Sequence, residues 1–169
     1  GCESRKKLAW RQEARLHEGK VIVVDRLSEQ RSGSFPENVV LEYRQEISFA
    51  NPNTGQRASW ELPTGLGIWM LDFDGATAYT VLKTKSIADY NRWDCPNPPW
   101  VVYRYQADSW DRLPIDELPT HFRKPNMLAA ANSDEKSSAD GLVTAQELDR
   151  HFKRLDPPYQ TITREKVSP

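Results

Sequence analysis

The stretch VVLEYRQEISF, residues 39–49, decides the fold class because apolar and polar side chains alternate along it. The apolar face consists of Val39, Leu41, Tyr43, Ile47 and Phe49, with Gln45 as its single polar member. The opposite face consists of Glu42, Arg44, Glu46 and Ser48. A period of two places successive side chains on opposite sides of a β-strand. The stretch therefore predicts a strand with one buried face and one wet face.

Turn signals separate this stretch from further strands along the chain. Residues 51–55 (NPNTG) form one turn, and Asp74-Gly75 is a strong two-residue hairpin signal. The apolar runs predict seven strands in all, over residues 21–24, 39–49, 56–62, 68–73, 76–84, 100–105 and 110–113. Short connections favour antiparallel pairing of consecutive strands. We therefore expect a mainly β fold, an antiparallel meander of about seven strands that forms a small curled sheet, barrel or sandwich.

The segments outside these strands divide the chain into three parts. Residues 1–8 are expected to be an N-terminal tether, residues 9–128 the β-rich domain, and residues 129–169 a polar linker with an extended tail. Thr144-Ala145-Gln146-Glu147 is a capping box, which predicts a short helix over about 144–155. Small, polar and helix-breaking residues predict loops over 27–38 and 125–141.

Composition and charge limit the classes of partner. The chain has 169 residues, with 23 Lys and Arg against 24 Asp and Glu, and a formal net charge of −1. A general nucleic-acid binder presents a strongly basic surface, so no nucleic-acid partner is expected. No apolar run approaches the ~20 residues that a transmembrane helix needs, so the chain as given is not expected to cross a membrane.

The first residues suggest where in the cell the protein is located. Gly1-Cys2 is similar to the last two residues of a bacterial lipobox, and Cys2 would then carry the lipid. A lipid at Cys2 would anchor the domain on the periplasmic side of a bacterial membrane, and the basic run 5–7 (RKK) would contact anionic headgroups. Glu3 after the cysteine favours the outer membrane by resemblance to enteric sorting rules. The alternative is an ordinary thiol, which could pair with Cys95 in an oxidising compartment.

An aromatic and proline-rich segment is the strongest candidate for binding. Aromatic residues recur at Tyr90, Trp93, Trp100, Tyr103, Tyr105 and Trp110, among prolines and polar side chains. Such a set can form a stacking surface for sugars or a hot spot for a protein partner. The expected binding residues are Trp93, Trp100, Tyr90, Asn97 and Arg92, with the two tryptophans exposed beside loop prolines. The alternative is that most of these aromatic side chains form the core.

Two motifs in this segment carry a family resemblance. The stretch YNRWDCPNPPWVVYRY (90–105), followed by WDRLPIDELP (110–119), resembles a group of predicted proteobacterial lipoproteins without an established activity. In that group an aromatic–Asn-Pro-Pro–aromatic strand precedes a W-x-R-[IL]-P segment. Trp10 and the stretch 16–24 (LHEGKVIVV) also resemble the opening of these proteins. The resemblance covers about residues 8–128; it implies a lipoprotein and assigns no catalytic residue.

The remaining candidate chemistry is weak. Asp140-Gly141 and Glu147 match part of a calcium-binding loop, but Lys136 stands where the first carboxylate belongs and opposes the cation. The histidines, His17, His121 and His151, share no metal-ligand spacing. No metal site is therefore predicted beyond this weak calcium candidate.

The function predicted from the sequence is binding without catalysis. No catalytic or cofactor motif is present, so no cofactor is expected and the chain is predicted to bind an envelope component or protein partner through the aromatic and proline-rich segment. One alternative is a hydrolase of cell-wall glycans or peptides that uses Asp89 or Asp94. Another is a structural subunit that docks through its C-terminal tail.

Overall fold

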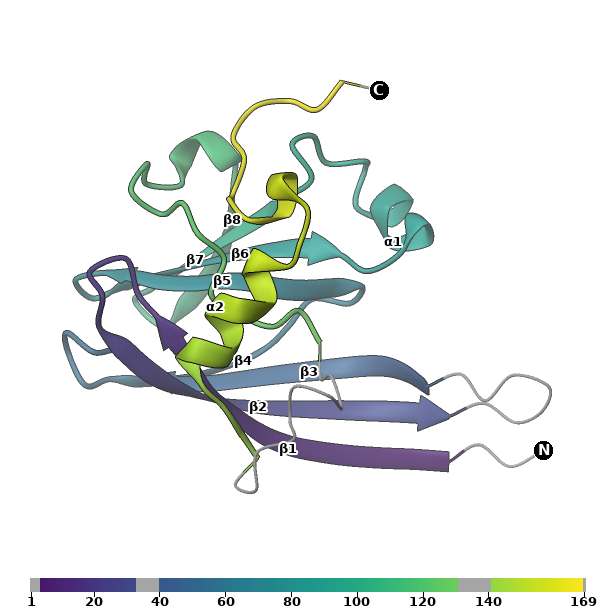
Figure 1. The fold of residues 1–169 in the computed structure, drawn as a ribbon, viewed down its shortest axis with the longest axis horizontal. Coiled ribbons are helices and arrows are strands. Elements are labelled where there is room, and N and C mark those ends of the chain that lie inside the picture. Colours follow the sequence, from purple (N-terminus) through teal and green to yellow (C-terminus); the bar gives the residue numbers. More distant parts are fainter. Residues whose placement is uncertain (1–3, 33–39, 131–140, 169) are drawn as a thin grey trace.

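A computed structural model, which describes residues 4–32, 40–130 and 141–168, shows two packed β-sheets (Figure 1). Sheet A has the strand order β4-β3-β2-β1-β9, and sheet B has the order β5-β6-β7-β8. The strands of sheet A are β1 (Ser4–Arg15), β2 (Val21–Ser32), β3 (Val40–Ala50), β4 (Arg57–Glu61) and β9 (Leu142–Val143). Those of sheet B are β5 (Leu66–Asp74), β6 (Thr77–Thr84), β7 (Val101–Gln106) and β8 (Ser109–Leu113). Only the β1–β9 pair, among the described strands, is parallel. The predicted mainly β, antiparallel fold is confirmed, as an open sandwich.

The main core lies between the two sheets. Ile47 and Phe49 of β3 are almost fully buried, and Phe49 packs edge-to-face on Phe73 of β5 with ring centroids 5.5 Å apart. Burying an apolar side chain of this size contributes roughly 1.5–3 kcal/mol. Two tryptophans from opposite sheets add a stack at the edge of the core: Trp60 of β4 and Trp110 of β8 lie 4.0 Å apart at an interplanar angle of 6°. Ile47 and Phe49, two members of the apolar face predicted for the deciding stretch, therefore lie at the contact between the sheets. Val39 and the side chains of Leu41 and Tyr43 lie outside the described residues.

A second core covers the outer face of sheet B. Phe122 and Ile162 are buried there with residues of β5, β6 and β7. They belong to the loop after the one-turn 3₁₀ helix η1 (Ile115–Glu117) and to the C-terminal segment that follows η2 (Pro157–Tyr159). Arg164 fixes this segment by donating to the carbonyls of Leu118, Pro119 and Phe122. The tail that the sequence predicts to be extended is thus packed on the sheet.

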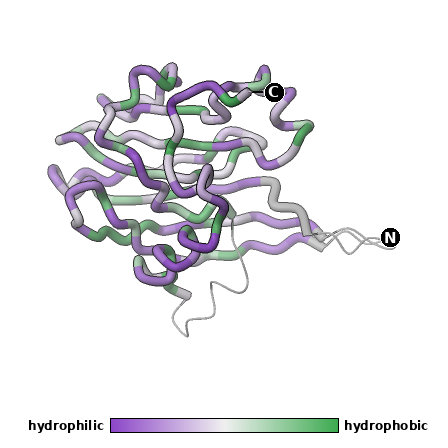
Figure 2. Tube along the Cα trace, turned by 45° about the horizontal axis from the view of Figure 1, so that its top comes forward, coloured by the Kyte–Doolittle hydropathy of each residue, from purple (hydrophilic) through white to green (hydrophobic). Residues whose placement is uncertain are grey.

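Strands β1 and β2 each correct a sequence prediction. Residues 4–8, which the sequence assigns to an N-terminal tether, are the first part of β1, a strand that pairs with β2 along its whole length. The loop predicted over 27–38 is wrong as far as Ser32, because β2 continues to that residue. Figure 1 shows β1, β2 and β3 extending past sheet B toward the N-terminus, and Figure 2 shows that this end is hydrophilic. Polar composition concealed these strands because much of their surface faces solvent.

The segment 125–129 is a loop, as the sequence predicts, but its residues 125–128 are buried. The backbone amides of Asn126 and Met127 donate to the Trp69 carbonyl at 2.9 and 3.1 Å. The Asn126 side chain accepts from the Leu71 amide at 2.9 Å and donates to the Leu71 and Arg15 carbonyls at 2.8 and 3.1 Å. The segment therefore satisfies the open edge of β5, where an unpaired backbone group would cost free energy.

A buried arginine attaches the same segment to sheet A. Arg26 of β2 is 3% exposed, lies 4.6 Å from the Trp10 ring centroid, and donates to the Leu128 carbonyl at 2.9 Å. The same guanidinium donates to the side-chain oxygens of Gln12 and Gln45. Gln45 is the polar member of the apolar face of β3 because its side-chain oxygen accepts a hydrogen bond from the buried Arg26 guanidinium.

The two α-helices lie outside the sheets. Helix α2 (Ala145–Lys153) begins at the predicted cap, where the Thr144 hydroxyl accepts from the Glu147 amide at 3.2 Å. Its Leu148 packs with Trp10 of β1. Helix α1 (Ile87–Arg92) lies in the aromatic and proline-rich segment and is not predicted from the sequence. Within the described ranges, no helix has the length and apolar character to span a membrane.

Candidate functional site

A groove of about 760 Å³ lies between helix α1, the loop 96–100 and the C-terminal segment. We call it the aromatic–proline groove. Its lining includes Lys83, Ile87, Tyr90, Pro96, Asn97, Pro99, Trp100, Tyr159 and Val167. Three of the five binding residues predicted from the sequence, Tyr90, Asn97 and Trp100, line this groove. Apolar side chains are exposed around it: Ile87 is 82% exposed and Val167 is 55% exposed.

The other two predicted binding residues lie outside the groove. Trp93 ends helix α1 and donates its indole N–H to the Thr64 carbonyl at 3.0 Å, while Arg112 lies over its ring. Arg92 pairs with Asp89 at 3.3 Å. The expected exposure of Trp100 is wrong: the residue is 5% exposed because it packs in the second core with Trp69.

Asn97 makes the most informative contact in the groove. Its side-chain amide donates to the Val167 carbonyl at 3.0 Å and accepts from the Val167 amide at 2.7 Å. A carboxamide that satisfies both backbone polar groups of one residue recognises main chain and not a particular side chain. The groove is therefore able to hold a polypeptide segment through its backbone.

Lys83 places a cation at the wall of the groove. Its ammonium lies 4.2 Å from the Tyr159 ring centroid and 5.4 Å from that of Trp69. Burial lowers the pKa of Lys83, since partial removal from water disfavours its charged form. An anionic ligand group here would form an ion pair with the Lys83 ammonium and so compensate for the solvation that the ammonium has lost.

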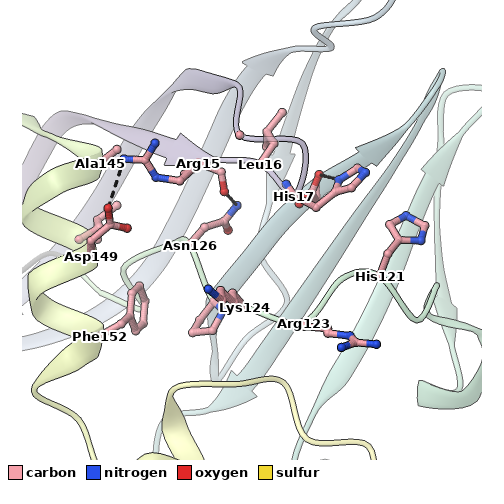
Figure 3. Close-up of a pocket in the computed structure, with 14 residues that line it drawn as sticks. Arg15, Leu16, His17, His121, Arg123, Lys124, Asn126, Ala145, Asp149 and Phe152 are labelled. Atoms are coloured by element: carbon pink, nitrogen blue, oxygen red, sulfur yellow. Dashed lines mark hydrogen bonds and ion pairs between the residues drawn. The ribbon is translucent and has the colours of Figure 1, made fainter.

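A second concavity, of about 330 Å³, lies between the β1–β2 turn, the loop 121–126 and helix α2 (Figure 3). We call it the histidine cleft. Figure 3 shows His17 and His121 close together on one side, with Asp149 and Phe152 of α2 on the other. Arg15 and Asp149 form an ion pair at 3.2 Å across its rim. Arg123 and Lys124 also line the cleft and are exposed.

Each histidine in this cleft contacts an aspartate from β5. His17 Nδ1 lies 2.8 Å from Asp72 Oδ1, and the His17 backbone amide donates to Asp72 Oδ2 at 2.8 Å. His121 Nε2 lies 2.8 Å from Asp74 Oδ1, and the two imidazole centroids are 4.7 Å apart. Asp72 and Asp74 share a face of β5 because they are two residues apart in a strand.

Sequence spacing could not reveal this cluster. His17 sits on a tight turn, where the Leu16 amide donates to the Lys20 carbonyl at 2.8 Å, and His121 lies on a loop of the other half of the fold. Only the i, i+2 pair of aspartates before the Asp74-Gly75 hairpin carries a signal in the sequence. Neither histidine has a ligand motif around it.

Other candidates from the sequence stay outside these two concavities. Asp89 accepts the Ser86 hydroxyl at 2.8 Å at the start of α1, and Asp94 is exposed. Glu147 belongs to the first turn of α2, while Asp140 lies outside the described residues. Cys2 also lies outside them, and the exposed Cys95 thiol donates to Asn91 Oδ1 at 3.4 Å.

Comparison of the chain with family models, with curated proteins and with solved structures finds no match. The geometry of the two concavities is therefore the basis on which a function can be argued.

Proposed function

We propose that this protein is a non-enzymatic, lipid-anchored domain on the periplasmic side of a bacterial membrane, which binds an extended segment of an envelope protein in the aromatic–proline groove. The observation that carries the proposal is the pair of hydrogen bonds between the Asn97 amide and the backbone of Val167. The groove already holds one polypeptide segment, in cis, through contacts that do not depend on its side chain. A partner segment would take the place of residues 165–168.

Charge and apolar surface define the chemistry of the partner. The Lys83 ammonium, with its pKa lowered by burial, favours a segment that carries an acidic side chain. Ile87 and Tyr159, which is 40% exposed, offer apolar contacts on either side of that charge. Exposed apolar side chains next to a hydrogen-bonding group such as the Asn97 amide are typical of a protein-binding site.

A peptide fits this groove better than a glycan does. Sugar rings stack on exposed aromatic faces, and the central tryptophan of the groove, Trp100, is buried. The carboxylates proposed for a glycan hydrolase also do not favour that activity, because Asp89 caps a helix and pairs with Arg92. We therefore commit to an acidic, extended peptide segment as the ligand.

The basic surface of β1 supports the anchored orientation. Arg5, Lys6 and Lys7 are exposed at the end of the strand that follows Cys2. Basic side chains close to an acylated residue add attraction to anionic headgroups of roughly 1 kcal/mol each. The intact mass of the native protein, extracted from membranes, tests this part: a diacylglyceryl adduct on Cys2 supports it, and an unmodified chain refutes it.

Photo-crosslinking in the native envelope tests the groove. A photoreactive residue replaces Ile87 beside the groove, and the matched control replaces Val23, which is 45% exposed on β2. We expect position 87, and not position 23, to crosslink one envelope protein at one mapped segment. Absence of a crosslink at position 87, or the same products at both positions, would overturn the assignment.

A synthetic peptide of the mapped segment then tests the contacts. Ending the chain after Arg164 removes the competing Val167 contact and should tighten peptide binding. In that shortened chain, Asn97→Ala and Lys83→Met should each weaken binding by about tenfold, the equivalent of one charge-assisted or double hydrogen bond. Binding that all three changes leave unaltered would show that the peptide occupies another surface.

A further inference from the structure

The histidine cleft contains three side chains of the types that bind transition metals. His17, Asp74 and His121 each offer one ligand atom, and these atoms all lie within 4.8 Å of one another. They come from the β1–β2 turn, the end of β5 and the loop after η1, so the fold itself brings them together. We propose that these three residues bind a zinc ion.

A buried carboxylate orients the first of these ligands. Asp72 is 4% exposed, and its oxygens accept from the His17 backbone amide and from the Phe73 amide, each at 2.8 Å. An ionised carboxylate only accepts hydrogen bonds, so His17 Nδ1 carries the proton in its 2.8 Å contact with Asp72. With Nδ1 as the donor to Asp72, Nε2 is the ring nitrogen that can bind a metal. A carboxylate–histidine pair of this kind is the usual support of a metal-bound imidazole.

The separations of the ligand atoms suit a small metal ion. Bonds of ~2.0–2.2 Å to nitrogen and oxygen in a tetrahedral site place ligand atoms about 3.3 Å apart. His121 Nε2 and Asp74 Oδ1 lie 2.8 Å apart, and one ring nitrogen of His17 belongs with a nitrogen of His121 and an oxygen of Asp74 to a set whose atoms all lie within 4.8 Å of one another. Changes in separation of up to about 1.5 Å are therefore sufficient. The side chains of His121 and Asp74 are 46% and 40% exposed, which leaves them room to move.

The local charge also favours a cation between the two rings. The imidazole centroids are 4.7 Å apart, so both rings are close enough to contact one ion between them. Glu18 adds another carboxylate, 3.6 Å from His17 Nε2. Arg123 and Lys124 oppose a cation, but both are exposed, and solvent screens exposed charges. Two imidazoles with one carboxylate select zinc over magnesium or calcium, which prefer oxygen ligands.

Three protein ligands leave a coordination position for an exogenous group. His17 and His121 both line the cleft, so this position would face its 330 Å³ space. The exposed cations Arg123 and Lys124 stand at the same opening. The site is therefore suited to hold zinc together with water or a small anionic ligand, independently of the aromatic–proline groove.

Metal titration of the full chain tests the proposal. The chain carries Cys2→Ser and Cys95→Ser so that thiols cannot bind zinc, and it is freed of metal with a chelator. We expect calorimetry to show one equivalent of Zn²⁺ bound, and Co²⁺ to give the visible absorption of a tetrahedral site. His121→Ala and Asp74→Asn should each weaken zinc binding by more than the ~10–100-fold that follows loss of a supporting residue.

The third histidine provides the matched control. His151 lies on α2 and is not part of the ligand set, so His151→Gln should leave affinity and the Co²⁺ spectrum unchanged. Circular dichroism of the metal-free variants verifies that they are folded. Both substitutions are expected to preserve the fold because the side chains of His121 and Asp74 are partly exposed. Absence of a Zn²⁺ equivalent in the starting chain, or equal affinities in the His121→Ala and His151→Gln variants, would overturn the proposal.

Discussion

Replacing Asn126 by aspartate changes one atom of a buried side chain and isolates the role of the segment 125–129. The amide donates to the Leu71 and Arg15 carbonyls and accepts from the Leu71 amide. A carboxylate retains the acceptor and loses both donors. Each buried acceptor left without a donor costs ~1–3 kcal/mol, so the loss is about 2–6 kcal/mol. At roughly 2–4 °C per kcal/mol for a chain of this size, a central value of ~4 kcal/mol lowers Tm by ~8–16 °C.

Urea and thermal unfolding in the presence of a chelator measure this change without any contribution from bound metal. The pH dependence supplies a second, independent readout. The introduced carboxyl is buried against carbonyls, so its pKa in the folded state rises above the unfolded value of ~3.9. A raised pKa means that stability is lost as the pH rises through the folded-state value. The deficit of the variant should therefore shrink as the pH falls toward about 4.

An exposed asparagine serves as the control. Asn53 donates to the Gly75 carbonyl at 2.9 Å on the surface of a turn, and Asn53→Asp should change stability by less than about 1 kcal/mol. If Asn126→Asp also changes the stability by less than about 1 kcal/mol, and if this change does not depend on pH, the segment 125–129 does not stabilise the edge of β5.

Three further predictions follow from the packing of the sheets. Trp110→Leu removes the stack with Trp60 and should cost about 2 kcal/mol in urea unfolding, with loss of the exciton signal of the tryptophan pair in circular dichroism; an unchanged signal would contradict the stacking. Gly67→Ala places a Cβ atom 2.8 Å from the Ala129 carbonyl oxygen, so urea unfolding should show a loss of ~1–3 kcal/mol; wild-type stability would mean that this approach is not close. Burial raises the pKa of the Tyr103 hydroxyl, and the nearby positive charge of Arg112 lowers it by a smaller amount. The neutral Tyr103 therefore contributes to stability in full below about pH 10, and this contribution is lost as the pH rises through the folded-state pKa. Tyr103→Phe should therefore flatten the decline of stability above about pH 10, and a decline as steep as that of the wild type would exclude this role.

The sequence predicts the fold class correctly where the buried positions are apolar and follow the two-residue period of a strand. The deciding stretch and the Asp74-Gly75 hairpin predict β3 and the β5–β6 pair, because one face of each strand is apolar or a turn residue marks its end. The prediction failed for β1 and the end of β2, where polar residues occupy several of the buried positions and much of the remaining surface faces solvent. Gln12 and Arg26 are buried as partners of each other, and hydropathy cannot distinguish such a pair from a solvated surface.

The candidate sites divide in the same way. Tyr90, Asn97 and Trp100 lie close together in sequence, so composition alone pointed to the groove that they line. Composition did not indicate that Trp100 would be buried, since its partner Trp69 lies on another strand. His17 and His121 meet only after the two sheets have packed, because their spacing is set by the positions of a turn and a loop in the tertiary structure.

The pairing of β1 also gives the molecule two mechanically unequal ends. Tension on Ser4 along the strand loads the hydrogen bonds to β2 together, over all twelve residues, in shear. Tension on the C-terminal segment instead breaks first the two hydrogen bonds between Asn97 and Val167, and then the hydrogen bonds of Arg164. Forced unfolding is governed by the rate at which the loaded contacts break, and contacts that break one after another each meet a lower barrier than contacts that must break together. A chain held at its N-terminus is therefore held by its stronger end, and a pull on its tail opens the aromatic–proline groove long before the sandwich yields.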